Sequence, residues 1–306
     1  MTMTETRIAH PEQADLPLVY PPALDNQIIY VVGDIHGRRD LLEQVHQLID
    51  KDKARLPWWL RARRRGLNLA ASSATHDRLT ARGRRPPRNE GLRQPSDPLS
   101  ELRHSVLPPL EPAVLEIYLG DYIDRGDDSR AVVELLIERS QTTKTVFLRG
   151  NHEQFLLDFL AGTLDFSIWK RVGAFSTLRS YNIQVGQFGF STSQNVLRSA
   201  LEKALAPKHG QFYSDTVPYY VAGPYLFVHA GVRPGILLEQ QHPADLMGIR
   251  RQFLQFEGSF GHVVVHGHTP VQAPEFKRNR INADTGAYST GRLTCLRIGP
   301  DGPRVL

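Results

Sequence analysis

The amino-acid sequence predicts an α/β sandwich in which mixed sheets are covered by helices on their outer faces. Three observations lead to this prediction. Five apolar, strand-like runs each stop abruptly at a short polar motif, segments with helical periodicity follow the early runs, and strands cluster late in the chain. The chain has 306 residues, of which 41% are hydrophobic, so it can bury a substantial core.

The expected elements can be justified in chain order. The first strand is a β-branched and aromatic run, and apolar residues at helical spacing follow it. The same two patterns recur further along the chain. The predicted strands are 28–32, 114–119, 145–148, 225–228 and 262–265, and the predicted helices are 39–49, 130–139 and 154–160.

The domain organisation is predicted from composition. Residues 1–27 read as a polar, proline-containing lead-in, and 28–306 as one domain interrupted by a basic insertion at about 52–110. Residues 51–103 hold 14 Lys and Arg against 5 Asp and Glu, a net charge of +9. Because the whole chain carries +5, the remainder carries 5 − 9 = −4, so the basicity belongs to one segment.

Composition also bears on the compartment. The single cysteine, Cys295, excludes an internal disulfide and a Cys-x-x-Cys metal cluster. The N-terminus lacks the basic and apolar regions of a secretory signal, and no apolar run approaches the roughly 20 residues that span a bilayer. We therefore expect a cytoplasmic protein without a membrane span.

Each predicted strand ends in a motif in which glycine lies within two residues of Asp, Asn or His. The motifs are Gly33-Asp-Ile-His-Gly37, Gly120-Asp-Tyr-Ile-Asp-Arg-Gly126, Gly150-Asn-His-Glu153, His229-Ala-Gly231 and His266-Gly-His-Thr269. Taken singly, each could be an ordinary turn or helix cap. Together they place carboxylate, amide and imidazole groups at strand ends, where α/β folds bind ligands. Such groups suit Mn, Fe or Zn, and a two-metal site of this kind hydrolyses phosphoesters.

These motifs resemble those of the calcineurin-like metallophosphoesterases, and more narrowly of the phosphoprotein phosphatases. The segments Arg149-Gly-Asn-His-Glu-Gln154 and Gly267-His-Thr-Pro270 look most like the small bacterial and bacteriophage lambda type of serine/threonine phosphatase. The resemblance covers about 28–50 and 113–298. It implies a four-layer α/β/β/α sandwich and two divalent ions, Mn first and Fe or Zn as alternatives, with a hydroxide bridging them.

The resemblance also implies a role for each matching residue. Six would bind metal: Asp34 and His36 the first ion, Asp121 both ions, and Asn151, His229 and His268 the second. His152 would be the general acid and Asp124 would orient it. Arg125 and Arg250 would bind the phosphate. Position 248 is Gly where the family has Trp, so Arg251 competes with Arg250 for this assignment.

The substrate is less tightly predicted than the site. The first interpretation is a serine/threonine protein phosphatase acting on phosphoproteins or phosphopeptides, because a serine alkoxide needs a general acid. The alternative is a symmetrical bis(5'-nucleosyl)-tetraphosphatase, which hydrolyses diadenosine tetraphosphate. That relative usually has Gly-Asn-His-Asp and lacks the carboxylate that pairs with the histidine, whereas this chain has Glu153 and Asp124.

Two hypotheses from other classes remain. The Arg-rich residues 61–93 could bind RNA or another polyanion through phosphate contacts, although the insertion has few aromatic residues beyond Trp58 and Trp59. A catalytically inactive scaffold is the other, and the presence of all six expected ligands argues against it. Among the neighbouring residues, Glu153 is expected to support its own loop, His266 to end a strand, and 284–288 to form a turn near the site.

Overall fold

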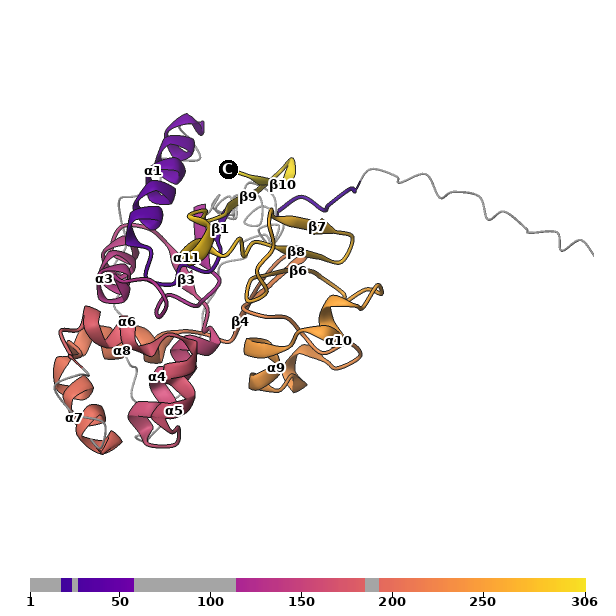
Figure 1. Ribbon diagram of the computed structural model, residues 1–306. Coiled ribbons are helices and arrows are strands. Elements are labelled where there is room, and N and C mark those ends of the chain that lie inside the picture. Colours follow the sequence, from indigo (N-terminus) through magenta and orange to yellow (C-terminus); the bar gives the residue numbers. More distant parts are fainter. Residues whose placement is uncertain (1–17, 24–26, 58–113, 185–192) are drawn as a thin grey trace, which may run out of the picture. The chain divides into compact units, whose positions relative to one another are not determined.

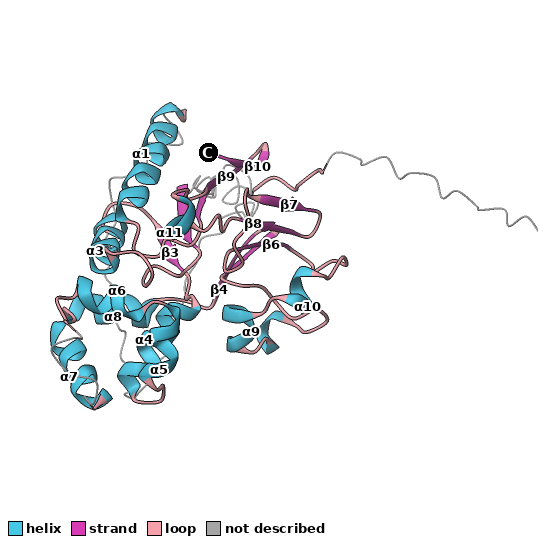
Figure 2. Cartoon of the chain, in the orientation of Figure 1, coloured by secondary structure: helices cyan, strands magenta, loops and turns pink. Residues whose placement is uncertain are grey.

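The computed structural model describes residues 18–23, 27–57, 114–184 and 193–306 (Figure 1). Two five-stranded mixed sheets flanked by helices form its framework (Figure 2). Most of the lead-in and most of the predicted insertion, including 61–93, lie outside the described residues. Within the described ranges, no helix combines the length and the apolar character that a membrane span requires.

The first sheet has the strand order β10-β9-β1-β2-β3. Its parallel strands are β1 (Ile28–Val32), β2 (Val114–Tyr118) and β3 (Thr145–Phe147), and β9 (Cys295–Gly299) and β10 (Gly302–Val305) complete it. β9 runs antiparallel to both β1 and β10. The carboxyl ends of the three parallel strands therefore all lie at the same end of this sheet.

The second sheet has the strand order β4-β5-β6-β8-β7. Its parallel strands are β5 (Tyr225–Val228), β6 (Val263–His266) and β8 (Arg280–Asn282), and its antiparallel edges are β4 (Tyr219–Ala222) and β7 (Glu275–Lys277). β4, β7 and β8, like β9 and β10 of the first sheet, were not among the strands predicted from sequence. β7 and β8 read Glu-Phe-Lys and Arg-Ile-Asn, which are not apolar runs.

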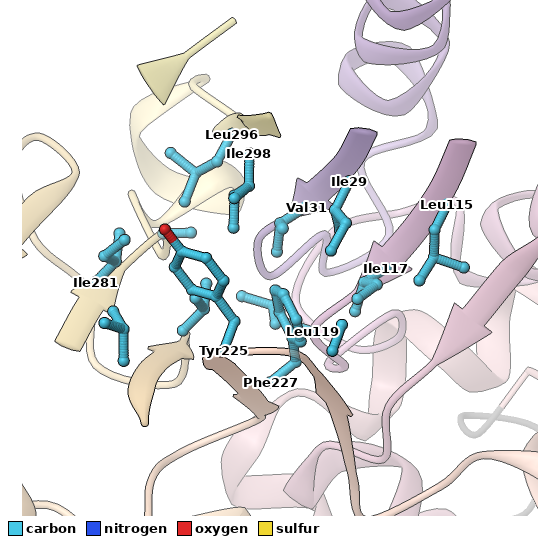
Figure 3. Close-up of a cluster of buried hydrophobic side chains, with 14 of the residues drawn as sticks. Ile29, Val31, Leu115, Ile117, Leu119, Tyr225, Phe227, Ile281, Leu296 and Ile298 are labelled. Atoms are coloured by element: carbon cyan, nitrogen blue, oxygen red, sulfur yellow. The ribbon is translucent and has the colours of Figure 1, made fainter. Parts of the chain in front are cut away.

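The main core lies between the two sheets. Alternate side chains of the first sheet, such as Ile29, Val31 and Ile117, pack with Phe227 and Ile281 of the second sheet (Figure 3). All five are fully buried. Because side chains alternate across a strand, the residues between them point to the outer faces of the sheets.

Helices cover both outer faces. On the first sheet, the outward Tyr30 donates a hydrogen bond to Asp52 of α1 (Arg39–Arg55), at 2.7 Å, and α3 (Ser129–Ser140) packs beside α1. On the second, the outward residues Leu226, Val228 and Val264 pack with three residues around α9 (Pro243–Gly248) and α10 (Arg251–Leu254), namely Leu246, Ile249 and Phe253. This is the predicted arrangement of two sheets between layers of helix.

A group of helices lies between β3 and β4 in the chain. These are α4 (Asn151–Ala161), α5 (Phe166–Trp169), α6 (Ala174–Ser180), α7 (Gln194–Ala204) and α8 (Pro207–Asp215). α4 contacts α5, α7 and α8, and α3 contacts α6 and α8. Only α4 was predicted from sequence.

The remaining helical elements are short. Two 3-10 helices, Lys170–Val172 and Leu238–Gln240, and the helix α11 (Ala287–Thr290) complete the described elements. α1 also runs further than predicted, to Arg55, through the first residues assigned to the insertion. The contact of Asp52 with Tyr30 explains why this last turn stays helical.

Candidate active site

The parallel strands of both sheets direct their carboxyl ends to one place. Asp34 follows β1, Asp121 follows β2 and Asn151 follows β3, while His229 follows β5 and His268 follows β6. The two sheets meet there, because the backbone N–H of His268 donates to Asp34 Oδ2 at 3.0 Å. All six predicted metal ligands therefore lie just beyond strands at the facing ends of the two sheets, five in loops and Asn151 at the start of α4.

Asp121 lies at the centre of the histidines. Its Oδ2 is 3.5 Å from His36 Nε2 and 3.7 Å from His152 Nε2, and its Oδ1 is 3.3 Å from His229 Nε2. Asn151 Oδ1 lies 3.2 Å from the same nitrogen of His229. Each oxygen of Asp121 thus faces a different set of rings, which is the arrangement that a carboxylate shared by two ions requires.

Two groups of side chains could each hold a metal ion. They are His36, Asp121 and His152 in one group and Asp121, His229 and His268 in the other, with ligand atoms within 4.8 Å of one another in each. Asp121 belongs to both groups. His152 belongs to the first by distance, although its other ring nitrogen contacts Asp124.

Backbone carbonyls orient two of the histidines. His36 Nδ1 lies 2.9 Å from the carbonyl oxygen of Ile123, and His229 Nδ1 lies 2.8 Å from that of Leu119. A ring that donates Nδ1–H to a carbonyl keeps the lone pair of Nε2 for a cation. Both Nε2 atoms face Asp121, so the two rings are already turned toward the centre of the site.

The surroundings of the Asp34 carboxylate fit a bound cation. The side chain is buried, and its Oδ1 has no hydrogen-bond partner among the described residues. Burial raises the pKa of Asp34 well above its ordinary value, and the charge of Asp284 adds to this effect. A buried carboxylate oxygen without a donor is rare unless an ion or water binds it. The surrounding oxygen and imidazole donors are those that Mn, Fe or Zn prefer.

The backbone is strained at the site. Six non-glycine residues of the described chain have positive φ, and all but Asn182 belong to the motifs: His36, Asp121, Asp124, Arg125 and His268, with φ from 48° to 69°. Such conformations cost on the order of 1–3 kcal/mol each and cluster at functional sites. Close backbone packing enforces them: a Cβ on Gly126 would lie 2.2 Å from the carbonyl oxygen of His36.

His152 forms a buried pair with Asp124. His152 Nδ1 lies 2.7 Å from Asp124 Oδ2, and both side chains are fully buried. Burial lowers the pKa of His152, but the charge of Asp121 and the hydrogen bond to Asp124 outweigh burial and raise the pKa overall. The two carboxylates around His152 thus act on its ring in the same direction.

The two arginines predicted to bind phosphate both lie at the site. Arg125 Nη2 is 3.3 Å from His152 Nε2, and its guanidinium lies over the ring of Tyr288, 4.6 Å from the centroid. Arg250 Nε donates to His268 Nε2 at 3.1 Å. Arg251, the competing assignment, instead donates to Gln255 at an exposed position. The structure therefore brings Arg250, and not Arg251, to the proposed ligands.

Glu153 supports the loops that carry the ligands. Its Oε2 accepts from the backbone N–H groups of Asp121 and Gly150, at 2.8 and 3.0 Å, and its Oε1 accepts from that of Tyr122 at 2.8 Å. Burial raises the pKa of Glu153 to about 7. These contacts agree with the role expected from sequence, a structural partner of the loop.

Asp284 is a site residue that sequence reasoning treated only as part of a turn. It is buried two residues after β8, and its Oδ1 accepts from the backbone N–H of Gly286 at 2.8 Å. Its signal was weak, because the preceding strand β8 reads Arg-Ile-Asn and is not an apolar run like the strands before the other motifs. It was missed because β8 was not predicted. His266, by contrast, packs edge-on against Phe253 as the last residue of β6 and belongs to neither group of possible ligands.

Comparison with known proteins indicates the class of protein to which this chain belongs. The profile of the family described as calcineurin-like phosphoesterase matches residues 95–297. A protein of Anoxybacillus flavithermus named bis(5'-nucleosyl)-tetraphosphatase PrpE, asymmetrical, is 29% identical over 202 residues, which are 59% of this chain and 74% of that protein. A protein of the same name from Bacillus cereus is 31% identical over 188 residues, with the same coverage.

Among solved structures, one described as a putative diadenosine tetraphosphatase has the same fold. It superposes with a TM-score of 0.53 at 14% sequence identity, over 94% of this chain and 98% of that one. At this identity the likeness concerns the fold alone. The topology of two facing mixed sheets is thus shared by a protein whose sequence has largely diverged.

The fold and the donor set define a hydrolase acting on phosphoester bonds, whose family implies divalent metal ions. The family profile spans well over half of the chain, so the protein belongs to the calcineurin-like phosphoesterase family. This confirms the fold and the family that were predicted from the five motifs. The matched segment begins at residue 95, so Asp34 and His36 lie outside it, and β1 brings them to the site by pairing with β2.

Proposed function

We propose that this protein is a serine/threonine protein phosphatase that uses two divalent metal ions. The buried pair of His152 and Asp124 beside Asp121 is the observation that carries this proposal. A serine or threonine alkoxide is a poor leaving group, so its departure is greatly helped by a positioned general acid. A phosphoanhydride needs such an acid much less.

The six predicted ligands divide between the two ions. Asp34 and His36 would hold one ion, Asn151, His229 and His268 the other, and Asp121 both. When bound, the ions lower the pKa of a coordinated water and neutralise charge on the phosphoryl group. The oxygen and imidazole donor set favours Mn, with Fe or Zn as alternatives.

The protein's own side chains do the remaining work. The guanidinium groups of Arg125 and Arg250 would bind the non-bridging phosphate oxygens, a task to which their planar, always charged forks are suited. His152 would donate the proton on Nε2 to the leaving oxygen, since its Nδ1 is engaged by Asp124. Asp124 would hold the ring in this orientation and stabilise its charge.

The assignment of the second arginine can be tested with its neighbour as control. Arg250→Ala is expected to lower kcat/KM for an aryl phosphate about 10- to 100-fold, because a hydrogen bond to a charged group contributes roughly 1.5–3 kcal/mol. Arg251→Ala should change it less than about threefold, since this side chain donates to Gln255 at an exposed position. A larger loss in Arg251→Ala would transfer the phosphate contact to that residue.

A second candidate function rests on the relatives. Two similar proteins are named bis(5'-nucleosyl)-tetraphosphatase, asymmetrical, whereas the alternative expected from sequence was the symmetrical enzyme. The two kinds differ in products, since unequal cleavage of diadenosine tetraphosphate yields ATP and AMP and equal cleavage yields two ADP. If the second candidate holds, product analysis therefore also shows which kind of cleavage this protein performs.

One substrate panel decides between the candidates. The Mn-loaded protein is assayed on a phosphoserine peptide, an aryl phosphate and diadenosine tetraphosphate, with Asp121→Asn prepared in parallel to subtract contaminating phosphatases. We expect kcat/KM for the phosphoserine peptide to exceed that for the dinucleotide by about tenfold or more, because the general acid contributes most where the leaving group is poorest. A higher kcat/KM for the dinucleotide would overturn the proposal and favour the second candidate.

A further inference from the structure

A helical corner outside the five motifs contacts the proposed general-acid pair. This α5–α6 corner, residues 166–180, comprises α5, the 3-10 helix Lys170–Val172, Gly173 and α6. Nothing in its sequence resembles a catalytic motif, and it was not predicted as helix. Its contacts with Asp124 and Arg125 are the reason for considering it further.

Trp169 ends α5 and reaches the same carboxylate oxygen as His152. Its Nε1–H donates to Asp124 Oδ2 at 2.8 Å, and the indole is fully buried. The rings of Phe159 and Phe166 pack against it, with centroids at 5.5 and 6.2 Å. A side chain packed in this way has one orientation, so the position of its N–H is fixed.

Thr177 of α6 holds the other oxygen. Its hydroxyl donates to Asp124 Oδ1 at 2.5 Å and accepts from the backbone N–H of Asp124 at 2.9 Å. The Thr177 hydroxyl therefore binds both the side chain and the backbone of Asp124, whose φ is +69°. With Trp169 and His152, it leaves each oxygen of the buried carboxylate with a donor.

The corner also packs against Arg125. Gly173 has φ of +119°, and a Cβ at that position would lie 2.7 Å from the backbone nitrogen of Arg125 and 3.1 Å from its Cγ. The α5–α6 corner thus touches two adjacent residues with separate proposed tasks. The two groups of the corner that contact Asp124, the indole N–H of Trp169 and the hydroxyl of Thr177, are neutral donors.

We infer that Trp169 and Thr177 are positioning residues, which hold the Asp124 carboxylate in the orientation that directs His152 toward the leaving group. This rests on the general-acid role in the proposed function. Neutral donors fix the carboxylate without adding a positive charge that would compete with the imidazolium for it. The contrasting interpretation is that both residues only satisfy a buried carboxylate and support the fold.

The test compares leaving groups. Trp169→Phe keeps a packed ring and removes the N–H, and Thr177→Val removes the hydroxyl. Each variant is assayed, loaded with Mn, on a phosphoserine peptide and on p-nitrophenyl phosphate, whose leaving group needs no proton. We expect kcat for the peptide to fall about tenfold and kcat for the aryl ester less than about twofold, since each variant loses one hydrogen bond to a charged group.

The matched control stays within the same corner. Phe175→Leu changes an exposed ring of α6 that packs on Phe166, so the ring contacts and the hydrogen bond of Trp169 stay in place and any loss should be equal for the two substrates. Bound metal per chain and the Tm are measured for every variant. Equal losses on both substrates in Trp169→Phe and Thr177→Val would overturn the inference and leave only a structural role.

A double-mutant cycle with His152→Asn separates this inference from the proposed function. If Trp169 acts through His152, Trp169→Phe should cost nothing further on the peptide once His152 is replaced. Additive losses would overturn the inference even where His152→Asn shows the expected leaving-group dependence. Equal losses on both substrates in His152→Asn alone would instead overturn the general-acid role itself.

Discussion

Asp121→Asn is expected to lower kcat about 10³-fold or more and to reduce the metal bound per chain, because two ions supply several kcal/mol of charge stabilisation and would lose their shared ligand. Asp34→Asn should lose activity to a similar extent, since the variant removes a charged ligand of one ion. The amide keeps an oxygen that can accept from the His268 N–H. Both losses would be measured on an aryl phosphate together with elemental analysis.

The same two substitutions should change the stability of the metal-free protein in opposite directions. Burial, with the nearby charge of Asp284, raises the pKa of Asp34 well above its ordinary value. A raised folded-state pKa means that the folded protein binds more protons than the unfolded chain, so ionised Asp34 destabilises the fold at pH 7. Asp34→Asn removes this charge and should raise the Tm.

For Asp121 the expected change in Tm has the opposite sign. Burial opposes its ionisation, but the charges of His229 and His152 outweigh burial and hold its pKa well below its ordinary value. A lowered pKa contributes stability that is present above the unfolded-state pKa and is lost as the pH falls through the folded-state pKa. Asp121→Asn should therefore lower the Tm at pH 7.

The measurement is thermal unfolding at pH 7 in the presence of a chelator. Asp301→Asn, at an exposed turn between β9 and β10, serves as the control and should leave the Tm nearly unchanged. Shifts of the same sign for Asp34→Asn and Asp121→Asn would contradict this electrostatic account. Unchanged metal content in either variant would contradict the ligand assignment independently of stability.

His152→Asn is expected to separate substrates by leaving group. Hydrolysis of a phosphoserine peptide should fall by about 10²–10⁴, the usual contribution of a general acid. Hydrolysis of p-nitrophenyl phosphate should fall less than about tenfold, because nitrophenolate departs without a proton. The two substrates share the phosphoryl group, so they control for binding and metal content within one variant.

The comparison of the two substrates also has an outcome that would contradict the general-acid role. Losses of equal size on both substrates would mean that His152 acts elsewhere than on the leaving group, for example as a ligand in the group that it forms with His36 and Asp121. Metal analysis of His152→Asn distinguishes that case, because a ligand's replacement releases metal and a general acid's does not.

The motifs and the strands that precede them were predictable because their signals are local. A buried strand shows as an apolar run, and a glycine beside Asp, Asn or His marks the turn that ends it, so the motifs and their order could be read directly. The family and the fold followed from them. Of the helices that were not predicted, α5 and α6 have only four and seven residues and lack a long periodic signal. α7 has 11 residues, as many as the predicted α4, so its length does not explain why it was missed.

The amino-acid sequence alone was sufficient for the fold class, the family and the identity of the residues gathered at the strand ends. Only the tertiary structure placed Asp284, Trp169 and Thr177 at the site, and showed that Arg250 contacts His268 whereas Arg251 contacts Gln255. The physical reason is the separation in sequence between the residues that interact. Strand periodicity and turn chemistry depend on adjacent residues, whereas Trp169 and Thr177 lie 45 and 53 residues from Asp124 and meet it only when the chain packs.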